Sequence, residues 1–239
     1  MDQTLHWFNS CLEERGIMLS PLQLEQFERY YELLIEWNER MNLTGITERD
    51  AVYEKHFYDS ISLAFFMNME EITRLADIGS GAGFPSIPLK ICYPHLQITI
   101  VDSLNKRIQF LNHLCNELKL DQVLCLHSRA EDASRKPEHR DCYDVVTARA
   151  VARLRVLNEF CLPFAKPGGI FVAMKGSQLH DELKEADFSL HELKGKLMKQ
   201  FDFELPNEKS KRHFVFISKS ASTPKKYPRK SGMPLKQPL

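Results

Sequence analysis

The 239-residue chain lacks the features of a membrane or secreted protein. It has no run of 18 apolar residues, so we expect no membrane-spanning helix. Its start, Met1-Asp2-Gln3, lacks the basic residues and apolar run of a signal peptide. It has no Cys-x-x-Cys pair, and its six cysteines are scattered. We therefore expect reduced thiols, no metal and a cytoplasmic location.

Net charge is absent as well, because 32 basic residues balance 32 acidic ones. That balance argues against a uniformly basic nucleic-acid-binding surface. The charges are nevertheless segregated, since residues 1–70 hold thirteen acids and five bases, whereas residues 218–239 hold six bases and no acid. Such a tail can bind a polyanion, and the alternative is a tail that only keeps the chain in solution.

The first seventy residues have a helical pattern. Ser20-Pro21-Leu22-Gln23 fits an N-cap, a proline in the first turn and a capping box. Apolar residues then recur at helical spacing, at Leu24, Phe27, Tyr31 and Leu34. A further helix is expected to begin at Thr47 and to continue towards Met67. Together these segments predict an acidic helical subdomain over residues 1–70.

From about Thr73, short apolar runs alternate with helical stretches. The expected strands are 75–78, 98–101, 123–126, 145–147 and 170–174, with helices at 87–91, 105–118, 154–164 and 180–197. This alternation predicts an α/β fold whose mainly parallel sheet is covered by helices on both faces. Residues 201–205 and 213–218 could add an antiparallel hairpin at the border. Ligands are then expected at the carboxyl ends of the parallel strands.

The chain changes character after Ser218. Spaced prolines occur there among lysines and serines, and this pattern opposes a packed core. We therefore expect one α/β domain over residues 71–218 and an extended, flexible tail over residues 219–239.

A glycine loop follows the first expected strand, with the sequence Asp77-Ile78-Gly79-Ser80-Gly81-Ala82-Gly83-Phe84. Glycines permit positive φ angles and let a ligand approach the backbone closely. A dinucleotide fingerprint requires G-x-G-x-x-G, but Phe84 stands where its last glycine should be. No Gly-Lys-Ser/Thr follows, so a P-loop is excluded.

The loop resembles motif I of class I S-adenosylmethionine (SAM)-dependent methyltransferases. The resemblance implies that the cofactor is bound by Asp77, Gly79, Gly81, Gly83 and Phe84. Asp102, at the end of the second strand, is expected to bind the ribose hydroxyls, and its alternative role is to cap the following helix. The backbone of Ala130 and the carboxylate of Glu131 are expected to flank the adenine, unless Glu131 is a solvated acid at a helix start.

An ordered set of motifs from about Asn42 to the C-terminus resembles the bacterial small-subunit ribosomal RNA methyltransferase G family, formerly called glucose-inhibited division protein B. The set comprises Asn42-Leu43-Thr44, His56-x-x-Asp59-Ser60, the glycine loop extended to Leu89, Asp102-Ser103-Leu104-Asn105-Lys106-Arg107, Thr147-Ala148-Arg149-Ala150 and Met174-Lys175-Gly176. Glycine is usual at the position of Ser86, where serine could instead cap the next helix.

This resemblance implies a Rossmann-like class I fold with a seven-stranded sheet and an N-terminal helical extension. It also implies SAM as the methyl donor and S-adenosylhomocysteine as the product. The implied reaction is methylation of N7 of a guanine in the 530 loop of 16S rRNA, guanine 527 in the usual rRNA numbering. We expect a monomer whose partner is 16S rRNA or the small ribosomal subunit.

Guanine N7 carries an in-plane lone pair and no proton, so its attack on the sulfonium methyl needs no general base. Catalysis then depends mainly on positioning, and Arg149 and Lys175 are the expected catalytic residues because they follow strands four and five. Arg149 could orient the cofactor or bind guanine O6 or a phosphate. Its alternative role is a structural ion pair with an acid such as Asp77.

Other side chains near these motifs have two possible roles. Phe84 could wall the cofactor or pack in the core. His56 and Asp59 are expected to pair beneath the site, and Arg212 and His213 are candidates for an RNA contact at its rim.

Three other functions are weighed against this one. A small-molecule methyltransferase is disfavoured by the basic tail, and a nonenzymatic RNA-binding protein with a vestigial pocket is disfavoured by the intact loop and Asp102. An NAD-dependent enzyme is disfavoured by Phe84.

Overall fold

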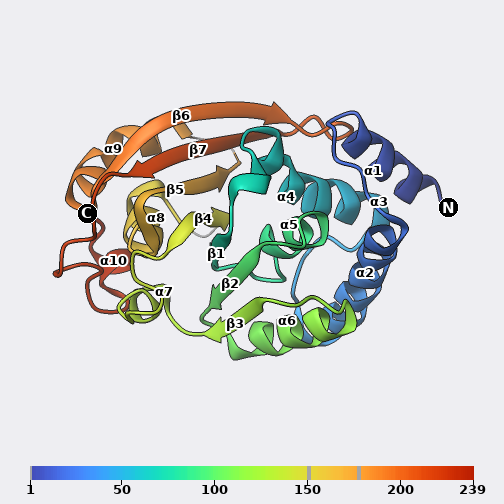
Figure 1. Cartoon of the computed structure of the whole chain (residues 1–239), viewed down its shortest axis with the longest axis horizontal. Coiled ribbons are helices and arrows are strands. Elements are labelled where there is room, and N and C mark those ends of the chain that lie inside the picture. The colour runs from blue at the N-terminus through green and yellow to red at the C-terminus, as the bar shows by residue number, and fades with distance from the viewer. Residues whose placement is uncertain (1, 150–151, 177–178) are drawn as a thin grey trace.

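The computed structural model describes residues 2–149, 152–176 and 179–239, and its centre is a seven-stranded sheet (Figure 1). The strand order is β3-β2-β1-β4-β5-β7-β6, with β7 antiparallel to both of its neighbours and the other pairs parallel. The predicted parallel sheet with an antiparallel hairpin at its border is confirmed. The strands are β1 (Arg74–Ile78), β2 (Gln97–Asp102), β3 (Val123–His127), β4 (Tyr143–Arg149), β5 (Ala165–Lys175), β6 (Gly195–Glu204) and β7 (Lys211–Lys219).

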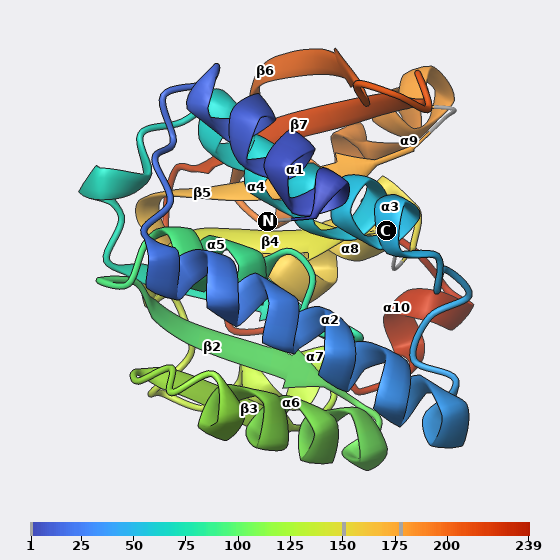
Figure 2. The ribbon, with the colours of Figure 1, turned by 90° about the vertical axis from the view of Figure 1, so that its right-hand side faces the viewer.

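Helices cover both faces of the sheet. Successive side chains of a strand point to opposite faces, and buried apolar side chains lie on both. Leu75 of β1 belongs to the core shared with α2 (Pro21–Met41), α5 (Ser86–Cys92) and α6 (Asn105–Glu117). Its neighbour Ala76 belongs to the opposite core, and the helices there are α7 (Ala130–Ala133), α8 (Leu154–Cys161) and α9 (Leu179–Glu192). Figure 2 shows α2 running beside α6 on the first of these faces.

The helical head packs directly on the sheet and shares its core. It contains α1 (Gln3–Glu13), α2, α3 (Arg49–Val52), the π-helical turn η1 (Tyr53–Tyr58), α4 (Asp59–Ile61), and the 3₁₀ turns η2 (Ser62–Phe65) and η3 (Met69–Glu71). Ser20 forms the predicted capping box with Gln23. The expected helix start at Thr47 is wrong, because α3 follows Glu48 and the path then changes to π and 3₁₀ turns. The division of the chain at residue 70 stays a prediction.

Two other predicted boundaries are also wrong. α8 ends at Cys161 rather than 164, since β5 begins at Ala165. α9 ends at Glu192, and residues 195–200 belong to β6, an edge strand. Most residues of this edge strand are exposed on both faces of the sheet. Their sequence therefore has no alternation of apolar and polar residues, which is the pattern that predicts a strand. Among the described residues, no helix combines the length and hydrophobicity needed to cross a membrane.

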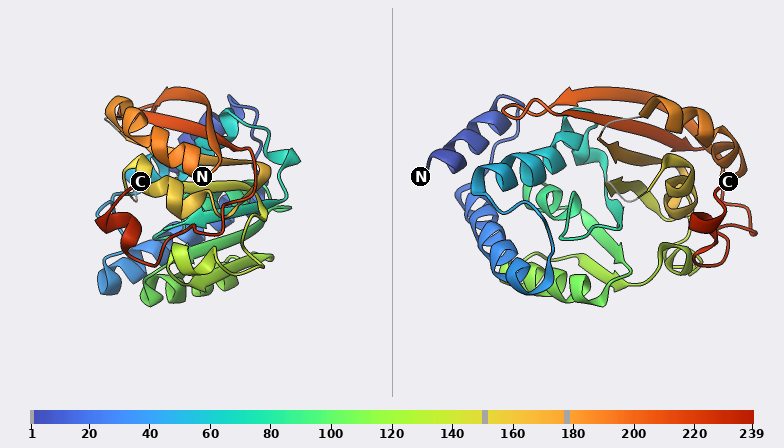
Figure 3. Two further views of the ribbon diagram at one scale, coloured as in Figure 1. Left: turned by 90° about the vertical axis from the view of Figure 1, so that its left-hand side faces the viewer. Right: turned by 180° about the vertical axis from the view of Figure 1, so that it is seen from behind.

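The expected extended tail is folded instead. Residues 220–239 turn back from the end of β7 and end in a short helix, α10 (Met233–Lys236), which lies against α8 (Figures 1 and 3). Lys219, Tyr227 and Pro234 are buried. The prediction failed because long-range polar contacts, rather than an apolar core of its own, hold this segment.

Candidate active site

The glycine loop lies between β1 and α5, and it is in contact with Tyr30 of the helical head. Gly79, Gly81 and Gly83 have φ angles of 75°, 64° and 104°, which only glycine adopts freely. A Cβ at Gly83 would come within 2.7 Å of the Tyr30 hydroxyl, so glycine is also required there for packing. Tyr30 itself donates a hydrogen bond to the Ala82 carbonyl at 2.6 Å. No atom lies within 4 Å of a Cβ placed at Gly81, so the loop is open on that side.

The open side borders a cavity of about 410 Å³, which we call the loop cavity. Its lining includes Gly79, Gly81, Phe84 and Asp102, four of the predicted cofactor residues. A smaller cavity of about 140 Å³ shares Gly79 and Ser103 with it and contains Ala130 and Glu131. The predicted site residues from four strand ends therefore meet along one edge of the sheet.

Asp102 does not cap α6, whose N-cap is Leu104 without a side-chain cap, and its ribose-binding role stays a prediction. Its Oδ1 accepts a hydrogen bond from the Leu104 N–H at 2.9 Å, just before α6. Its Oδ2 accepts hydrogen bonds from the Gly81 N–H at 3.1 Å and from Arg107 at 3.3 Å. A carboxylate has about four acceptor positions, so about one is left for a ligand. Asp102 thus fixes the shape of the loop while still lining the loop cavity.

Asp77 lies beneath the loop and borders neither cavity. It is fully buried, and its Oδ2 accepts a hydrogen bond from the Ser86 N–H at 3.2 Å, whereas its Oδ1 has no partner among the described residues. Burial raises the pKa of Asp77 to about 6. Ser86 does not cap α5, since Pro85 precedes the helix without a side-chain cap; its hydroxyl lies 3.3 Å from that of Ser80.

Arg149 lies at the boundary between the loop cavity and a third cavity of about 290 Å³, which we call the cationic cavity. Arg149 forms the structural ion pair that was the alternative, but its partner is Asp59 of the head at 2.9 Å rather than Asp77. The other oxygen of Asp59 pairs with Arg212 at 3.0 Å. One buried carboxylate therefore holds two guanidinium groups, and this triad keeps a net positive charge.

Phe84 packs in the core, since it is 5% exposed, and it also borders the loop cavity, so its role as a wall of the cofactor site stays a prediction. Its ring stacks on His56 at 4.5 Å between centroids, and the Arg149 guanidinium lies 4.9 Å from it. His56 does not pair with Asp59 as predicted, because its Nε2 lies 2.8 Å from the Thr44 hydroxyl. Burial lowers the pKa of His56 to about 3, so the ring is neutral at pH 7.

Lys175, Arg212 and His213 all border the cationic cavity. Lys175 is nearly buried, and it donates to the Ala152 carbonyl at 2.7 Å and pairs with Glu182 at 2.8 Å. These contacts fix Lys175 in the cavity wall, and its catalytic role stays a prediction. His213 lies 2.7 Å from Asp202. Ala150, which belongs to the Thr147–Ala150 motif, lies outside the described residues.

Sequence reasoning missed several residues of the site. Leu43 and Thr44 border the loop cavity, and their signal was the Asn42-Leu43-Thr44 motif, to which no role was assigned. Tyr30 gave no signal, because a buried aromatic residue on a helix has the spacing of an ordinary core residue. Leu235 borders the small cavity from a segment that was expected to be extended.

Comparison with known proteins agrees with this geometry. The model of the rRNA small subunit methyltransferase G family (GidB) matches residues 23–214. The ribosomal RNA small subunit methyltransferase G of Bacillus cytotoxicus is 55% identical over 232 residues, which cover 97% of each chain. These matches extend through the head, the loop and the sheet.

Two solved structures share the fold at low identity. An M. jannaschii protein in complex with AdoMet has a TM-score of 0.52 and 17% identity, and the match covers 68% of this chain and 74% of that one. The [4+2]-cyclase SpnF has a TM-score of 0.57 and 13% identity, covering 86% and 99%. Both support the class I methyltransferase fold, although a cyclase on this fold illustrates that the fold does not fix the reaction. The family model and the 55% identity over nearly the whole length give the more specific assignment. This chain belongs to the rRNA small subunit methyltransferase G family.

Proposed function

We propose that this chain transfers the methyl group of SAM to N7 of a guanine in the 530 loop of 16S rRNA, guanine 527 in the usual rRNA numbering. The observation that carries the proposal is the pair of adjacent cavities that share Arg149 and His56. One is bordered by glycine backbone and Asp102, and the other by cationic side chains. A cofactor and an RNA base can therefore meet at Arg149.

The charges around the loop suit SAM, which carries an ammonium and a sulfonium group. Asp102 borders the loop cavity and Asp77 lies buried beneath the loop, so both carboxyl groups are close to the place where SAM would bind. Asp102 would accept a hydrogen bond from one ribose hydroxyl, since the protein already uses most of its acceptor positions. Ala130 and Glu131 would border the adenine in the small cavity.

The chemistry asks little of the protein beyond positioning. Bound SAM supplies a methyl group that is already activated for displacement. Arg149 is fixed by Asp59, so those of its N–H groups that have no partner among the described residues would hold guanine O6 beside the attacking N7. The neutral His56 ring would add no positive charge near a bound sulfonium. No general base is required, because N7 carries no proton.

The acceptor must leave its stack to reach the cationic cavity. The major groove of A-form RNA, where N7 lies, is too narrow and deep for side chains. We therefore propose an unpaired or extruded guanine as the substrate. Positive charge at the cavity would attract the flanking phosphates.

The test is mass-spectrometric mapping of 16S rRNA from a bacterial strain that lacks its own enzyme of this family and expresses this chain. We expect 7-methylguanosine to return in the 530 loop with the wild-type chain. Absence of the mark with well-expressed, folded protein would overturn the proposed substrate. Calorimetry with S-adenosylhomocysteine separately tests the cofactor, and Asp102→Ala should weaken that binding about tenfold while RNA affinity changes less.

A further inference from the structure

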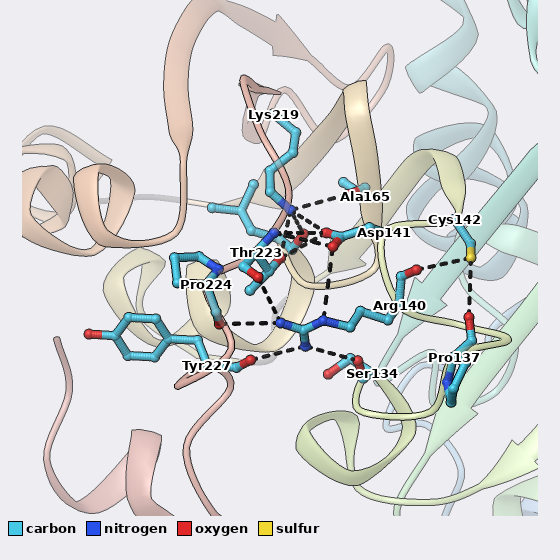
Figure 4. A network of polar contacts seen from close by, with 11 residues as sticks. Ser134, Pro137, Arg140, Asp141, Cys142, Ala165, Lys219, Thr223, Pro224 and Tyr227 are labelled. Atoms are coloured by element: carbon cyan, nitrogen blue, oxygen red, sulfur yellow. Dashed lines mark hydrogen bonds and ion pairs between the residues drawn. The ribbon is translucent and has the colours of Figure 1, made fainter.

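The C-terminal segment after β7 is clamped to the body by a buried polar network (Figure 4). Lys219 is 1% exposed, and its ammonium contacts Asp141 at 2.9 Å and the carbonyls of Leu162 and Ala165. Asp141 also accepts a hydrogen bond from the Thr223 hydroxyl at 2.9 Å. These contacts fix the point at which the segment leaves the sheet.

Arg140 fixes the next stretch of the same segment. Its guanidinium donates to the carbonyls of Thr223 at 2.8 Å, Pro224 at 3.2 Å and Tyr227 at 3.0 Å (Figure 4). One side chain thus satisfies three backbone acceptors that precede Pro228. This arginine therefore helps to set the path of residues 223–227, together with the burial of the Tyr227 ring in the core.

A second clamp lies on α8. Glu159 is fully buried, and it accepts hydrogen bonds from the Arg229 backbone N–H at 2.7 Å and from its guanidinium at 2.6 Å. Lys226 pairs with Glu192 at 2.6 Å. With Lys219, these contacts place three of the six bases after Ser218 in ion pairs within the chain.

The third contact brings the segment to the cofactor side of the sheet. The Gly232 N–H donates to Glu131 Oε1 at 2.8 Å, and α10 begins directly afterwards. The Leu235 side chain borders the small cavity together with Ile78, Val101 and Phe160. Leu235 is nevertheless 53% exposed, so much of its apolar surface has no partner within the chain.

We propose that the C-terminal segment is part of the cofactor site, with Leu235 as one wall of the pocket for the adenine ring and Glu131 as the positioning residue that holds Gly232 there. This rests on the proposed function, which places the adenine in the small cavity. A flat purine fits between the apolar side chains of two strand ends, α8 and α10, and would cover the exposed part of Leu235. Glu131 then acts through the segment, since one of its oxygens is already bound to Gly232.

The test uses calorimetry with S-adenosylhomocysteine and with 5′-methylthioadenosine, which keeps the adenine and ribose but lacks the amino-acid part. Leu235→Ala should weaken both ligands by the same factor, about five- to tenfold, because the lost contact is with the shared adenine. Leu22→Ala removes a side chain that is 62% exposed on α2, and it should change neither affinity.

A chain that ends at Lys230 tests the segment without disturbing its clamps. It keeps Arg140, Glu159 and Arg229 in contact, and it loses Gly232, Leu235 and only one base, Lys236. We expect an unchanged melting temperature without ligand and a loss of cofactor affinity at least as large as that of Leu235→Ala. Glu131→Gln should give an intermediate loss, equal for the two ligands.

The outcomes separate this inference from the proposed function. If the wild-type chain binds neither ligand, the proposed cofactor is overturned. If it binds both and the shortened chain binds them equally well, the segment is not part of the site. A loss for S-adenosylhomocysteine alone would also overturn the inference, since the lost contact would then lie outside the adenine.

Discussion

The acidic head and the basic tail flank the same sheet, but they are held by different forces. The head packs through buried aromatic and aliphatic side chains, among them Phe8, Phe27 and Phe57. The tail is held by buried ion pairs and by hydrogen bonds to its backbone, centred on Arg140, Asp141 and Glu159. The two regions of opposite charge therefore rely on different contacts, mainly apolar burial in the head, and ion pairs and hydrogen bonds beside the buried Tyr227 in the tail.

The two regions also reach different ends of the candidate site. The head supplies Tyr30 beneath the glycine loop and Asp59 beside Arg149. The tail supplies Leu235 at the small cavity. The head is thus suited to shape the methyl-transfer end, and the tail is suited to shape the opposite end.

The largest expected effect lies in the core of the head. Phe27→Ala removes a fully buried ring that packs on Phe8 and Phe57, and it should lower the free energy of unfolding by about 3–5 kcal/mol. Denaturant unfolding followed by circular dichroism measures this loss. Leu22→Ala, on the exposed side of the same helix, should stay within about 0.5 kcal/mol. A loss below about 1 kcal/mol for Phe27→Ala would mean that the head is not packed on the sheet as described.

The next effect concerns the contact between the head and Arg149. Arg149→Ala should lower kcat/KM for rRNA methylation about 100-fold, because the guanine would no longer be held in line with the methyl group. The fold should survive, since Asp59 keeps its pair with Arg212. Arg153→Ala is the matched control, as its side chain is 53% exposed and pairs with Glu185. Near-normal turnover by Arg149→Ala would remove Arg149 from the proposed mechanism.

A smaller effect should make the head sensitive to acid. Burial lowers the pKa of His56 to about 3, whereas in the unfolded chain it is about 6.5. As the pH falls, the imidazole of the unfolded chain is therefore protonated before that of the folded chain. The free energy of unfolding then decreases as the pH falls below about 6.5. Between pH 7 and pH 5 the loss from this group is about 2 kcal/mol.

Urea unfolding at the two pH values measures this loss. The pH dependence should become shallower in His56→Gln. It should be unchanged in His191→Gln, which replaces a side chain that is 80% exposed. An equal slope in both variants would show that His56 is not the group that makes the head acid-sensitive.

The smallest effect is expected at the surface of the tail. Lys226 is 66% exposed where it pairs with Glu192, so Lys226→Ala should cost less than about 1 kcal/mol of stability. Thermal unfolding at low and high salt checks this, because an exposed pair is screened by salt. A loss well above that figure would mean that the surface contacts, and not only Glu159 and Asp141, hold the tail.

Much of the site was predictable because its signals are local. The glycine loop, Asp102 and the strand ends lie in short segments, and parallel strands bring their carboxyl ends to one edge. The partner of Arg149 was not predictable in this way. Both Asp77 and Asp59 were available as carboxylates, and only the position of α4 beside β4 selects Asp59.

The sequence by itself determined the alternation of strands and helices, the ligand loop and the family, since each depends on residues close together in the chain or on an ordered set of motifs. Only the tertiary structure decided that residues 220–239 fold back onto the body of the protein. Arg229 meets Glu159 across 70 residues, Thr223 meets Asp141 across 82, and Gly232 meets Glu131 across 101. Proline and lysine give a segment little tendency to fold alone, whereas buried carboxylates supplied by the folded body stabilise it in one path.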